Sequence, residues 1–520
     1  MLLGGILRLI WLSSLPAGFN ADEAAFGYNA YSLLQTGRDE WGTAWFALPF
    51  TNLRSFGDYK LPLYSFLVVP SIKFFGLNEF STRLPNAVFG TMAIVAIYLL
   101  ARKLGFPALL AAALLAISPW HVQLSRGAFE ANLIVLFFPL AIYLFLTRRF
   151  IMSAVILAVS FYSYHTTRLL TPVLAVALML FSRKISPKFL FVLLLISLPG
   201  LWSMLGPGSS RLADIGVFSP TDNWQGVADQ RFAARNLGLP DPIARIFSNK
   251  ATAVFSQVVS NYTSYFSPQF LISQGPSEST YGMLTGVGVI YLLEAIFLAT
   301  FLVRLIRQPD KQATFIFILL LLSPIPAALS KGSGLAANRV AAMIPFLTLC
   351  LSLGLTHLIR STKPVIAVVA VLYLVHVAFF IHAMVYRSPF VTASSMSYGW
   401  KEAIGRLSPL AERFTDIRVS RVFSEPHIFL AFYLRYPPAK YQKHSQLWTD
   451  FSNRGFKFLD QVDGYYLGKY RFGDIHPTDV VKHPILFVGP PSQFPPTYPE
   501  YFHVDYPTGV AAIKVAEKLP

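Results

Sequence analysis

Apolar segments recur along most of the chain, and short clusters of Lys and Arg separate many of them. A bilayer core of about 30 Å takes about 20 apolar residues in helical form. About eleven segments are candidates for such membrane spans. They cover residues 1–15, 84–101, 106–119, 131–147, 150–166, 169–182, 188–204, 282–303, 313–330, 340–357 and 364–384. The chain is therefore expected to be a polytopic α-helical protein of the cell membrane.

The composition agrees with this expectation. Of the 520 residues, 54% are hydrophobic and only 13% are charged, whereas a soluble domain carries about 25% charged residues. These fractions exclude an ordinary soluble enzyme and a disordered protein. The single cysteine, Cys350, excludes a disulfide framework and a metal site built from cysteines.

Basic residues fall in alternate loops between the expected spans. The clusters are Arg102 and Lys103; Arg148 and Arg149; Arg183, Lys184 and Lys188; Arg304, Arg307 and Lys311; Arg360 and Lys363. Only Asp310 opposes them. Because cytoplasmic loops carry an excess of Lys and Arg, this side is expected to be cytoplasmic. The same clusters account for much of the net charge of +17 without a nucleic-acid partner.

The opposite, outer face then receives three loops and the C-terminal tail. The loops are residues 16–83, 120–130 and 205–281, and the tail begins at residue 385. Each of these three loops lies between two expected spans. The sequence therefore predicts two domains, a transmembrane domain at residues 1–384 and a second domain outside the membrane.

The tail, residues 385–520, differs in character from the rest of the chain. It carries charges of both signs together with Pro and Gly turns. Its pattern predicts helices at 400–414 and 426–435 and strands at 417–423 and 483–489. We expect a small extracytoplasmic α/β domain.

The first outer loop contains the densest group of candidate functional residues. Asn20 and Glu23 have the spacing of a helix N-cap and its capping partner, and Gly37 is a typical C-terminal stop. The sequence predicts an amphipathic helix between them, lying on the outer membrane surface. Asp22 and Glu23 fall in its first turn, where the helix dipole favours ionised carboxylates. They could act as a general base or metal ligand, or they could only cap the helix.

A second part of this loop brings cations to the membrane surface. The apolar run 61–76 is short and interrupted by a proline, and a span there would invert every basic loop downstream. It is therefore expected to be a second interfacial segment. Lys60 and Arg83 flank it, and cations at this depth suit phosphate binding or contact with lipid headgroups. Asp58 and Tyr28 are further candidates for lining a cavity.

Later outer segments add further polar residues. On a helix, Arg126 and Glu130 would form an i,i+4 pair. A charged pair that enters a membrane helix suggests a functional site. His165 and Arg168 lie at an outer helix end, and Arg339 returns a cation to the same face together with Lys331. We expect an outward-facing polar cavity that handles an anionic ligand.

Several of these segments together resemble a known family. They read ADEAAFGYNAYSLLQTG, GDYKLPLYSFLVVPSIKFFGLNEFSTRLPNAVFG, SPWHVQLSRGAFEAN and NRVAAMIP, and they span roughly residues 16–345. The arrangement resembles a polytopic GT-C glycosyltransferase. It is similar in particular to glycosyltransferase family 39, which includes protein O-mannosyltransferases and lipid A aminoarabinose transferases.

The resemblance implies an inverting transfer of a sugar from a polyprenyl-phosphate-linked donor. The acceptor would be a protein hydroxyl, a lipid or a cell-envelope glycan on the outer face. Asp22 is similar to the family's catalytic carboxylate and Glu23 to its neighbour, and Lys60 corresponds to a lysine on the donor phosphate. Arg126 and Glu130 match the second outer-loop motif, and Arg339 matches a late arginine near the phosphate. No β-trefoil domain like that of eukaryotic O-mannosyltransferases is evident in the sequence.

The resemblance leaves a divalent metal open, because members of the family differ in metal dependence. Glu23, Glu130 and His165 are the candidate ligands. Other classes of function also remain open. They are a polysaccharide polymerase or ligase that uses undecaprenyl-diphosphate donors, a lipid or glycan transporter, and a non-catalytic assembly or receptor protein. A transporter would place ionisable residues near helix midpoints, whereas here they gather at outer helix ends.

Overall fold

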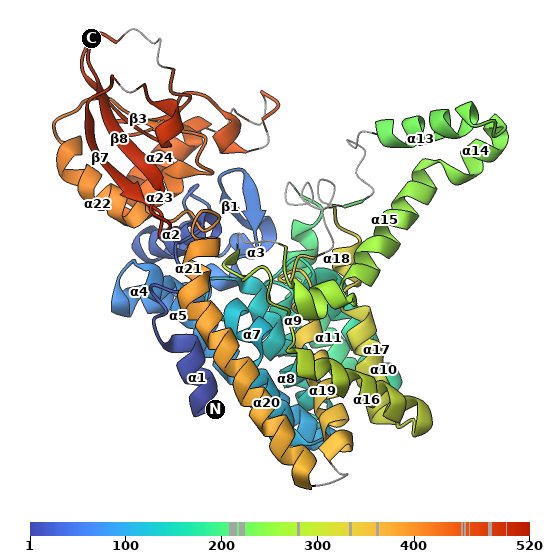
Figure 1. Ribbon diagram of the computed structural model, residues 1–520. Coiled ribbons are helices and arrows are strands. Elements are labelled where there is room, and N and C mark those ends of the chain that lie inside the picture. The colour runs from blue at the N-terminus through green and yellow to red at the C-terminus, as the bar shows by residue number, and fades with distance from the viewer. Residues whose placement is uncertain are drawn as a thin grey trace.

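The computed structural model describes residues 1–206, 216–217, 224–277, 281–331, 335–359, 363–448, 451, 454–456, 458–476, 481–495 and 497–520. A bundle of apolar helices forms the larger part, and a domain containing a β-sheet lies at one end of it (Figure 1). The first outer loop lies between the bundle and this C-terminal domain. Arg360 of the predicted basic loops lies outside the described residues.

Each of the apolar segments predicted as a span contains a helix. These helices are α1 (Leu2–Leu9), α5 (Glu79–Leu104), α6 (Ala108–Ile117), α8 (Leu133–Leu146), α9 (Phe150–Ser160), α10 (Thr167–Ser182), α11 (Pro187–Ser203), α16 (Leu292–Arg307), α17 (Lys311–Leu322), α19 (Met343–Ile359) and α20 (Lys363–His382). Within the described residues, 3 helical stretches are long and apolar enough to cross a membrane, namely Glu79–Leu104, Lys311–Ala328 and Ile366–Thr392. The number of spans therefore stays a prediction.

Helix α2 (Ala21–Thr36) begins and ends as the sequence predicts. The Asn20 side chain accepts from the backbone N–H of Glu23, the Glu23 side chain accepts from the backbone N–H of Asn20, and Gly37 is left-handed at φ 68°. The prediction of an amphipathic surface helix is wrong, because α2 is buried on most of its circumference. It packs against α4 (Leu63–Phe75) and α5 on one side and α23 (Pro426–Tyr433) on the other.

Gly27 shows how tightly α2 is enclosed. A Cβ at this position would lie 2.5 Å from the Phe432 ring of α23 and 2.6 Å from Thr82 Oγ1 of α5. Both distances are below those of real carbon contacts, so only glycine allows the two neighbours to approach from opposite sides. The helix that carries Asp22 and Glu23 is thereby fixed against both parts of the molecule.

A short hairpin follows α2, which the sequence analysis did not predict. After α3 (Leu48–Thr51), strand β1 (Leu53–Ser55) pairs antiparallel with β2 (Asp58–Lys60), in the register Leu53 to Lys60. The apolar run predicted to be interfacial is helix α4. The hairpin places Asp58 and Lys60 at the start of this helix, which packs on α2.

The remaining outer segments are mostly helical. A short α7 (Pro119–Leu124) precedes the single turn η1 (Glu130–Asn132), and α18 (Ile325–Ala328) follows α17. The long outer loop forms α13 (Gln225–Asn236), α14 (Asp241–Phe247), α15 (Lys250–Ser264) and a π-helical turn η3 (Gln269–Ser273). Helices α13, α14 and α15 project away from the bundle in Figure 1, and we call them the arm.

The C-terminal domain combines helices with a six-stranded mixed sheet. After η5 (Ala383–Arg387) and α21 (Ser388–Thr392) come α22 (Trp400–Ala411), β3 (Ile417–Ser420), α23, α24 (Pro438–Trp448), η7 (Leu459–Gln461), β4 (Tyr465–Leu467), β5 (Tyr470–Gly473), β6 (Ile485–Gly489), η8 (Pro491–Gln493), β7 (Glu500–Asp505) and β8 (Ala511–Lys518). The strand order is β4-β5-β3-β6-β8-β7, and β3 is parallel to both β5 and β6. The helices expected at 400–414 and 426–435 are α22 and α23, and the expected strands are β3 and β6.

Candidate functional site

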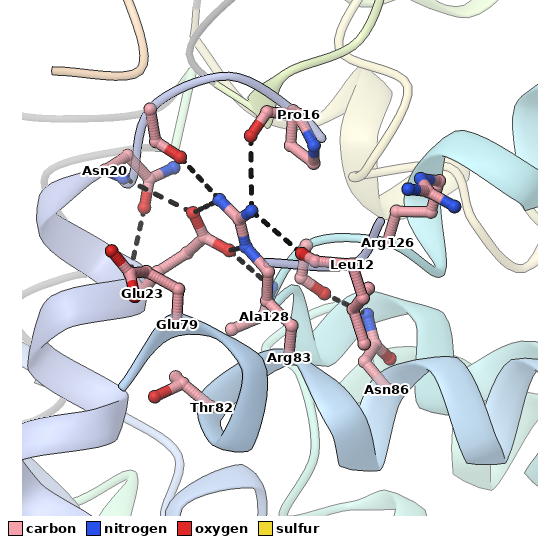
Figure 2. Close-up of polar contacts among 12 residues, drawn as sticks. Leu12, Pro16, Asn20, Glu23, Glu79, Thr82, Arg83, Asn86, Arg126 and Ala128 are labelled. Carbon is pink, nitrogen blue, oxygen red and sulfur yellow. Dashed lines mark hydrogen bonds and ion pairs between the residues drawn. The ribbon is translucent and has the colours of Figure 1, made fainter. Parts of the chain in front are cut away.

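Glu23 and Arg83 form a sealed ion pair where α2 meets α5 (Figure 2). Arg83 Nε lies 2.8 Å from Glu23 Oε1, and Arg83 Nη2 lies 2.9 Å from Oε2. The backbone N–H of Ala128 also donates to Oε1 over 2.9 Å. Both side chains of the pair are 0% exposed. This carboxylate is held from three directions and lies out of reach of solvent.

The guanidinium of Arg83 has no donor left for a ligand. Besides Glu23, it donates through Nη1 to the carbonyls of Leu12 and Pro16 and through Nη2 to that of Gly18. These bonds occupy all five of its N–H groups. The predicted phosphate contact by Arg83 does not fit this geometry, and the pair instead fixes the chain between α1 and α2.

Arg126 also binds backbone carbonyls of α1 and of the segment that follows it. Its Nη1 donates to Leu7 O over 2.6 Å, and its Nη2 donates to Ile10 O and Leu15 O over 2.6 and 3.2 Å. The predicted i,i+4 geometry with Glu130 is wrong, because α7 ends at Leu124 and the chain between the two residues is not helical. Burial and the nearby Arg83 lower the pKa of Arg126 to about 10, so it stays charged at neutral pH.

Lys60 and Asp22 form a second ion pair, which is open to solvent on one side. Lys60 Nζ contacts Asp22 Oδ1 and lies 3.6 Å from Asp58 Oδ2. Lys60 is 3% exposed, whereas Asp22 is 34% exposed. The structure therefore brings together three predicted site residues, with a buried cation between two carboxylates.

Aromatic rings hold the ammonium group of Lys60 from the protein side. Lys60 Nζ lies 4.9 Å from the ring centroid of Phe56 and 5.5 Å from that of Phe26. Ring faces attract a cation without neutralising it. The two rings help to fix the ammonium group of Lys60 between the hairpin and α2.

Two more predicted residues lie near the hairpin. His165 Nε2 is 3.2 Å from the carbonyl oxygen of Tyr59, the residue before Lys60. Arg168 Nη2 donates to Asn52 Oδ1 over 3.0 Å and to Ser203 Oγ over 2.8 Å. Its Nε and Nη1 atoms are buried without a hydrogen-bond partner among the described residues. The outer ends of α9 and α10 thus face the side of the hairpin that carries Lys60.

Arg339 reaches the same region through its neighbour. Its Nη1 donates to Ser330 Oγ over 3.1 Å and to Lys331 O over 2.9 Å. The adjacent Asn338 donates from Nδ2 to the hydroxyl of Tyr164 over 3.3 Å. Since Tyr164 precedes His165, this contact links the loop that carries Arg339 to the hairpin.

Tyr28 does not line an open cavity. It is fully buried, and its hydroxyl donates to the carbonyl of Tyr436 in the C-terminal domain over 2.8 Å. Its prediction as a cavity residue is wrong, because the next turns of α2 face the C-terminal domain. Helix α2 also receives bonds from Gln442, whose Nε2 donates to Ser32 Oγ and Thr36 Oγ1.

The sequence analysis missed a group of buried carboxyls beside the hairpin. Ser55 Oγ donates to Glu40 Oε1 over 2.6 Å, and burial raises the pKa of Glu40 to about 8. Burial also raises the pKa of Asp39 to about 6 and that of Glu425 well above its ordinary value. Nothing in the local sequence marks these residues, because their burial depends on docking of the C-terminal domain.

No group of three or more His, Cys, Asp or Glu side chains within the described ranges is arranged to hold a metal ion. Glu23 is engaged by Arg83, and His165 lies against the hairpin backbone. The three predicted ligands therefore do not form a metal-binding group in the part of the chain that the structure describes. They are Glu23, Glu130 and His165.

The fold and the site define a helical protein with apolar helices long enough to cross a membrane, and with an ion pair of a carboxylate and a lysine beside the β1–β2 hairpin. The fold is similar to that of ArnT from Cupriavidus metallidurans bound to undecaprenyl phosphate, with a TM-score of 0.53 and 13% identity. This likeness covers 99% of the chain and 97% of ArnT. The apo state of ArnT from the same organism matches over the same shares, with a TM-score of 0.41 and 14% identity.

At the sequence level, residues 60–205 match the family described as dolichyl-phosphate-mannose-protein mannosyltransferase. No curated protein sequence matches the chain. The family match and the likeness to ArnT confirm the resemblance to GT-C glycosyltransferases that the outer-loop motifs suggested.

Proposed function

We propose that this protein is a membrane glycosyltransferase that takes a sugar from a polyprenyl-phosphate donor. The observation that carries the proposal is the pair of Asp22 and Lys60, a half-exposed carboxylate beside a buried cation. The family matched by residues 60–205 is described by a dolichyl-phosphate-linked sugar, and the similar ArnT structure holds undecaprenyl phosphate. Both support a lipid-phosphate donor.

The proposed reaction is a single displacement with inversion. The oxygen of an acceptor hydroxyl attacks the anomeric carbon while the bond from that carbon to the phosphate oxygen breaks. Asp22 takes the hydroxyl proton as general base, and the phosphate leaves on its lipid. Lys60 stabilises the charge that grows on the phosphate, an effect that depends on its being fixed in place before the reaction.

The contact between Lys60 and Asp22 gives this site an order of events. While Lys60 pairs with Asp22, its ammonium group occupies Oδ1, one of the two carboxylate oxygens that could accept a proton. A donor phosphate is a competing anion for the same ammonium group. Its binding shifts the ammonium group from Asp22 toward the phosphate and so frees Oδ1, while Asp58, 3.6 Å from Lys60 Nζ, limits how far the lysine moves. The base therefore becomes active only when a donor is bound.

The other predicted residues take supporting roles. Arg168 has two unpartnered donors among the described residues, and it and Arg339 are candidates for the phosphate oxygens. Glu23, Arg83 and Arg126 are positioning residues, because their contacts fix the chain before α2. Reaction would take place on the outer face of the cell membrane, with a protein hydroxyl, a lipid or an envelope glycan as acceptor and with the C-terminal domain outside the cytoplasm.

The test follows a radiolabelled sugar carried on undecaprenyl phosphate. Purified wild type is expected to move the label into the water, protein or lipid fraction of an envelope extract, and the receiving fraction names the acceptor class. Asp22→Asn should slow this transfer by about 10²–10⁴-fold. Lys401→Ala, at an exposed side chain of α22, is the control.

Equal transfer by wild type and Asp22→Asn would remove Asp22 as the base. Retention of the label by both proteins across a panel of polyprenyl-phosphate sugars would overturn the transferase proposal. It would favour a transporter or a binding protein instead.

A further inference from the structure

A cavity of about 900 Å³ lies at the base of the arm, apart from the pair of Asp22 and Lys60. Residues of α13 and α15 line it, together with Lys331. Its volume falls in the range of small-ligand sites, about 300–1,000 Å³. The side chains that characterise it are Trp224, Phe247, Gln230, Gln257, Ser260 and Lys331.

The lining of this arm cavity differs from that of the ion-pair site. Its polar groups are mostly amides and hydroxyls, which both donate and accept hydrogen bonds. Two aromatic rings, Trp224 and Phe247, add apolar faces. None of the lining residues that the structure describes is a carboxylate. This combination matches a sugar ring, which has an apolar C–H face and a rim of hydroxyls.

The arm has little core of its own. No side chain of α13 is buried, and only Ala244 of α14 and Asn261 of α15 are. An element with few buried apolar contacts costs little free energy to shift. Large apolar side chains such as Phe232 stay 67% exposed. The cavity walls can therefore adjust to a ligand without disturbing the helix bundle.

A series of contacts connects Lys331, in the lining of the arm cavity, with the hairpin that carries Lys60. Arg339 donates to the carbonyl of Lys331, and its neighbour Asn338 donates to Tyr164. The next residue, His165, contacts the hairpin backbone just before Lys60. Asn261 of α15 donates to the carbonyl of Ser330 over 2.9 Å. These contacts link the arm cavity to the hairpin that carries Lys60.

We infer that the arm cavity binds an oligosaccharide, the glycan portion of the acceptor. The inference rests on the proposed function in one respect, because only a transferase has an acceptor. Binding of the oligosaccharide itself does not require sugar transfer. Stacking on Trp224 would supply affinity, and the amides of Gln230 and Gln257 would orient the hydroxyls.

The experiment measures binding directly, with the full chain in lipid nanodiscs. The probes are neutral hexasaccharides of glucose, mannose or N-acetylglucosamine, added without donor. At least one should bind the wild type with a Kd of about 1 mM or lower. Trp224→Ala and Gln230→Ala should each weaken binding, the tryptophan variant by about tenfold or more.

Phe255→Ala is the matched control, since Phe255 is an aromatic residue of α15 that is 71% exposed and does not line the cavity. Its affinity should stay within about twofold of wild type. Trp224→Phe, which keeps a ring, should recover most of the lost affinity. No saccharide binding by the wild type, or equal binding by Trp224→Ala, would overturn the inference.

Sugar transfer and undecaprenyl phosphate binding are measured on the same preparations. Saccharide binding that depends on Trp224 in a protein without transfer would remove the proposed function and keep this inference. Transfer at the wild-type rate by Trp224→Ala at low acceptor concentration would remove this inference and keep the proposed function. Binding of an unglycosylated peptide alone would replace the glycan by a polypeptide and so contradict the inference.

Discussion

Asp22 and Glu23 are consecutive in the first turn of α2, yet their surroundings are opposite. Glu23 pairs with Arg83 in a site where both side chains are 0% exposed, and Asp22 pairs with Lys60 while remaining 34% exposed. Successive residues of a helix point about 100° apart, so one carboxylate faces α5 and the other faces the hairpin. The same turn therefore provides a structural ion pair and a candidate reacting pair.

The partner cations reinforce this difference. Arginine presents a planar fork of five donors, and Arg83 uses all of them on Glu23 and on backbone carbonyls. Lysine is a compact charge that can change partners, and Lys60 contacts two carboxylates and two aromatic rings. The planar fork gives rigidity, whereas the compact ammonium group beside the partly exposed Asp22 is the candidate contact for a substrate anion.

Removal of Glu23 should have the largest effect on the folded state. Glu23→Ala leaves the Arg83 charge buried and unpaired, which costs about 3–5 kcal/mol of folding free energy. We expect poor recovery of folded protein and a markedly lower midpoint of thermal unfolding in detergent. An unfolding midpoint equal to wild type would show that the sealed pair is not structural.

Removal of Lys60 should reduce transfer rather than stability. Lys60→Ala takes away the charge that faces the leaving phosphate, and loss of one such group costs about 10²–10³ in rate. Lys60→Arg keeps the charge but changes its shape, so it should recover only part of the activity. Initial rates at saturating donor provide the measurement. Full activity of Lys60→Ala would contradict the proposed difference between a structural ion pair and a reacting one.

Glu40 sharpens the comparison, because it is as buried as Glu23 but receives its hydrogen bond from Ser55 rather than from an arginine fork. Burial raises its pKa from the usual 4.5 to about 8. The stability that neutral Glu40 contributes is therefore complete below pH 4.5 and is lost as the pH rises to about 8. Lys60 and Asp39 are the charged neighbours that influence this titration.

The unfolding midpoint should accordingly fall between about pH 5 and pH 8. Glu40→Gln keeps an oxygen that accepts from Ser55, and it should flatten this fall. A pH profile that is the same in wild type and Glu40→Gln would contradict the assignment.

A third ion pair should give the smallest effect. Lys401 of α22 lies 3.1 Å from Glu79, but its side chain is 67% exposed. Exposed pairs contribute about 0–1 kcal/mol, so Lys401→Ala should shift the unfolding midpoint by no more than a few degrees. Glu79 keeps the hydrogen bond from the Tyr433 hydroxyl. A fall in the unfolding midpoint as large as that of Glu23→Ala would mean that solvent exposure does not determine how much each ion pair contributes to stability.

Local signals made much of the fold predictable. The capping residues Asn20 and Glu23 and the stop at Gly37 define α2, and apolar runs locate the bundle helices. The motifs also indicated Asp22 and Lys60, which the hairpin brings into contact. The helix predictions succeeded because caps and periodicity are determined by neighbouring residues, and the roles of Asp22 and Lys60 stay predictions.

Long-range pairing could not be predicted in the same way. Glu23 and Arg83 are 60 positions apart, so no local pattern indicated that this carboxylate would engage the donors of Arg83. The full burial of α2 depends on the C-terminal domain, as the bond from Tyr28 to Tyr436 shows. The hairpin tip is likewise held by Leu459, whose N–H donates to Phe56 O over 3.1 Å. Such contacts follow from tertiary packing alone.

The most direct test compares Asp22→Asn with Glu23→Gln in one experiment. Transfer of the polyprenyl-phosphate-linked sugar is measured per folded molecule, together with the midpoint of thermal unfolding. We predict that Asp22→Asn unfolds near the wild-type temperature but loses transfer by about 10²–10⁴-fold. Glu23→Gln should unfold at a clearly lower temperature, and its folded fraction should transfer faster than Asp22→Asn. The reverse pattern, with Asp22→Asn active and Glu23→Gln stable but inactive, would contradict the division of roles between the two carboxylates.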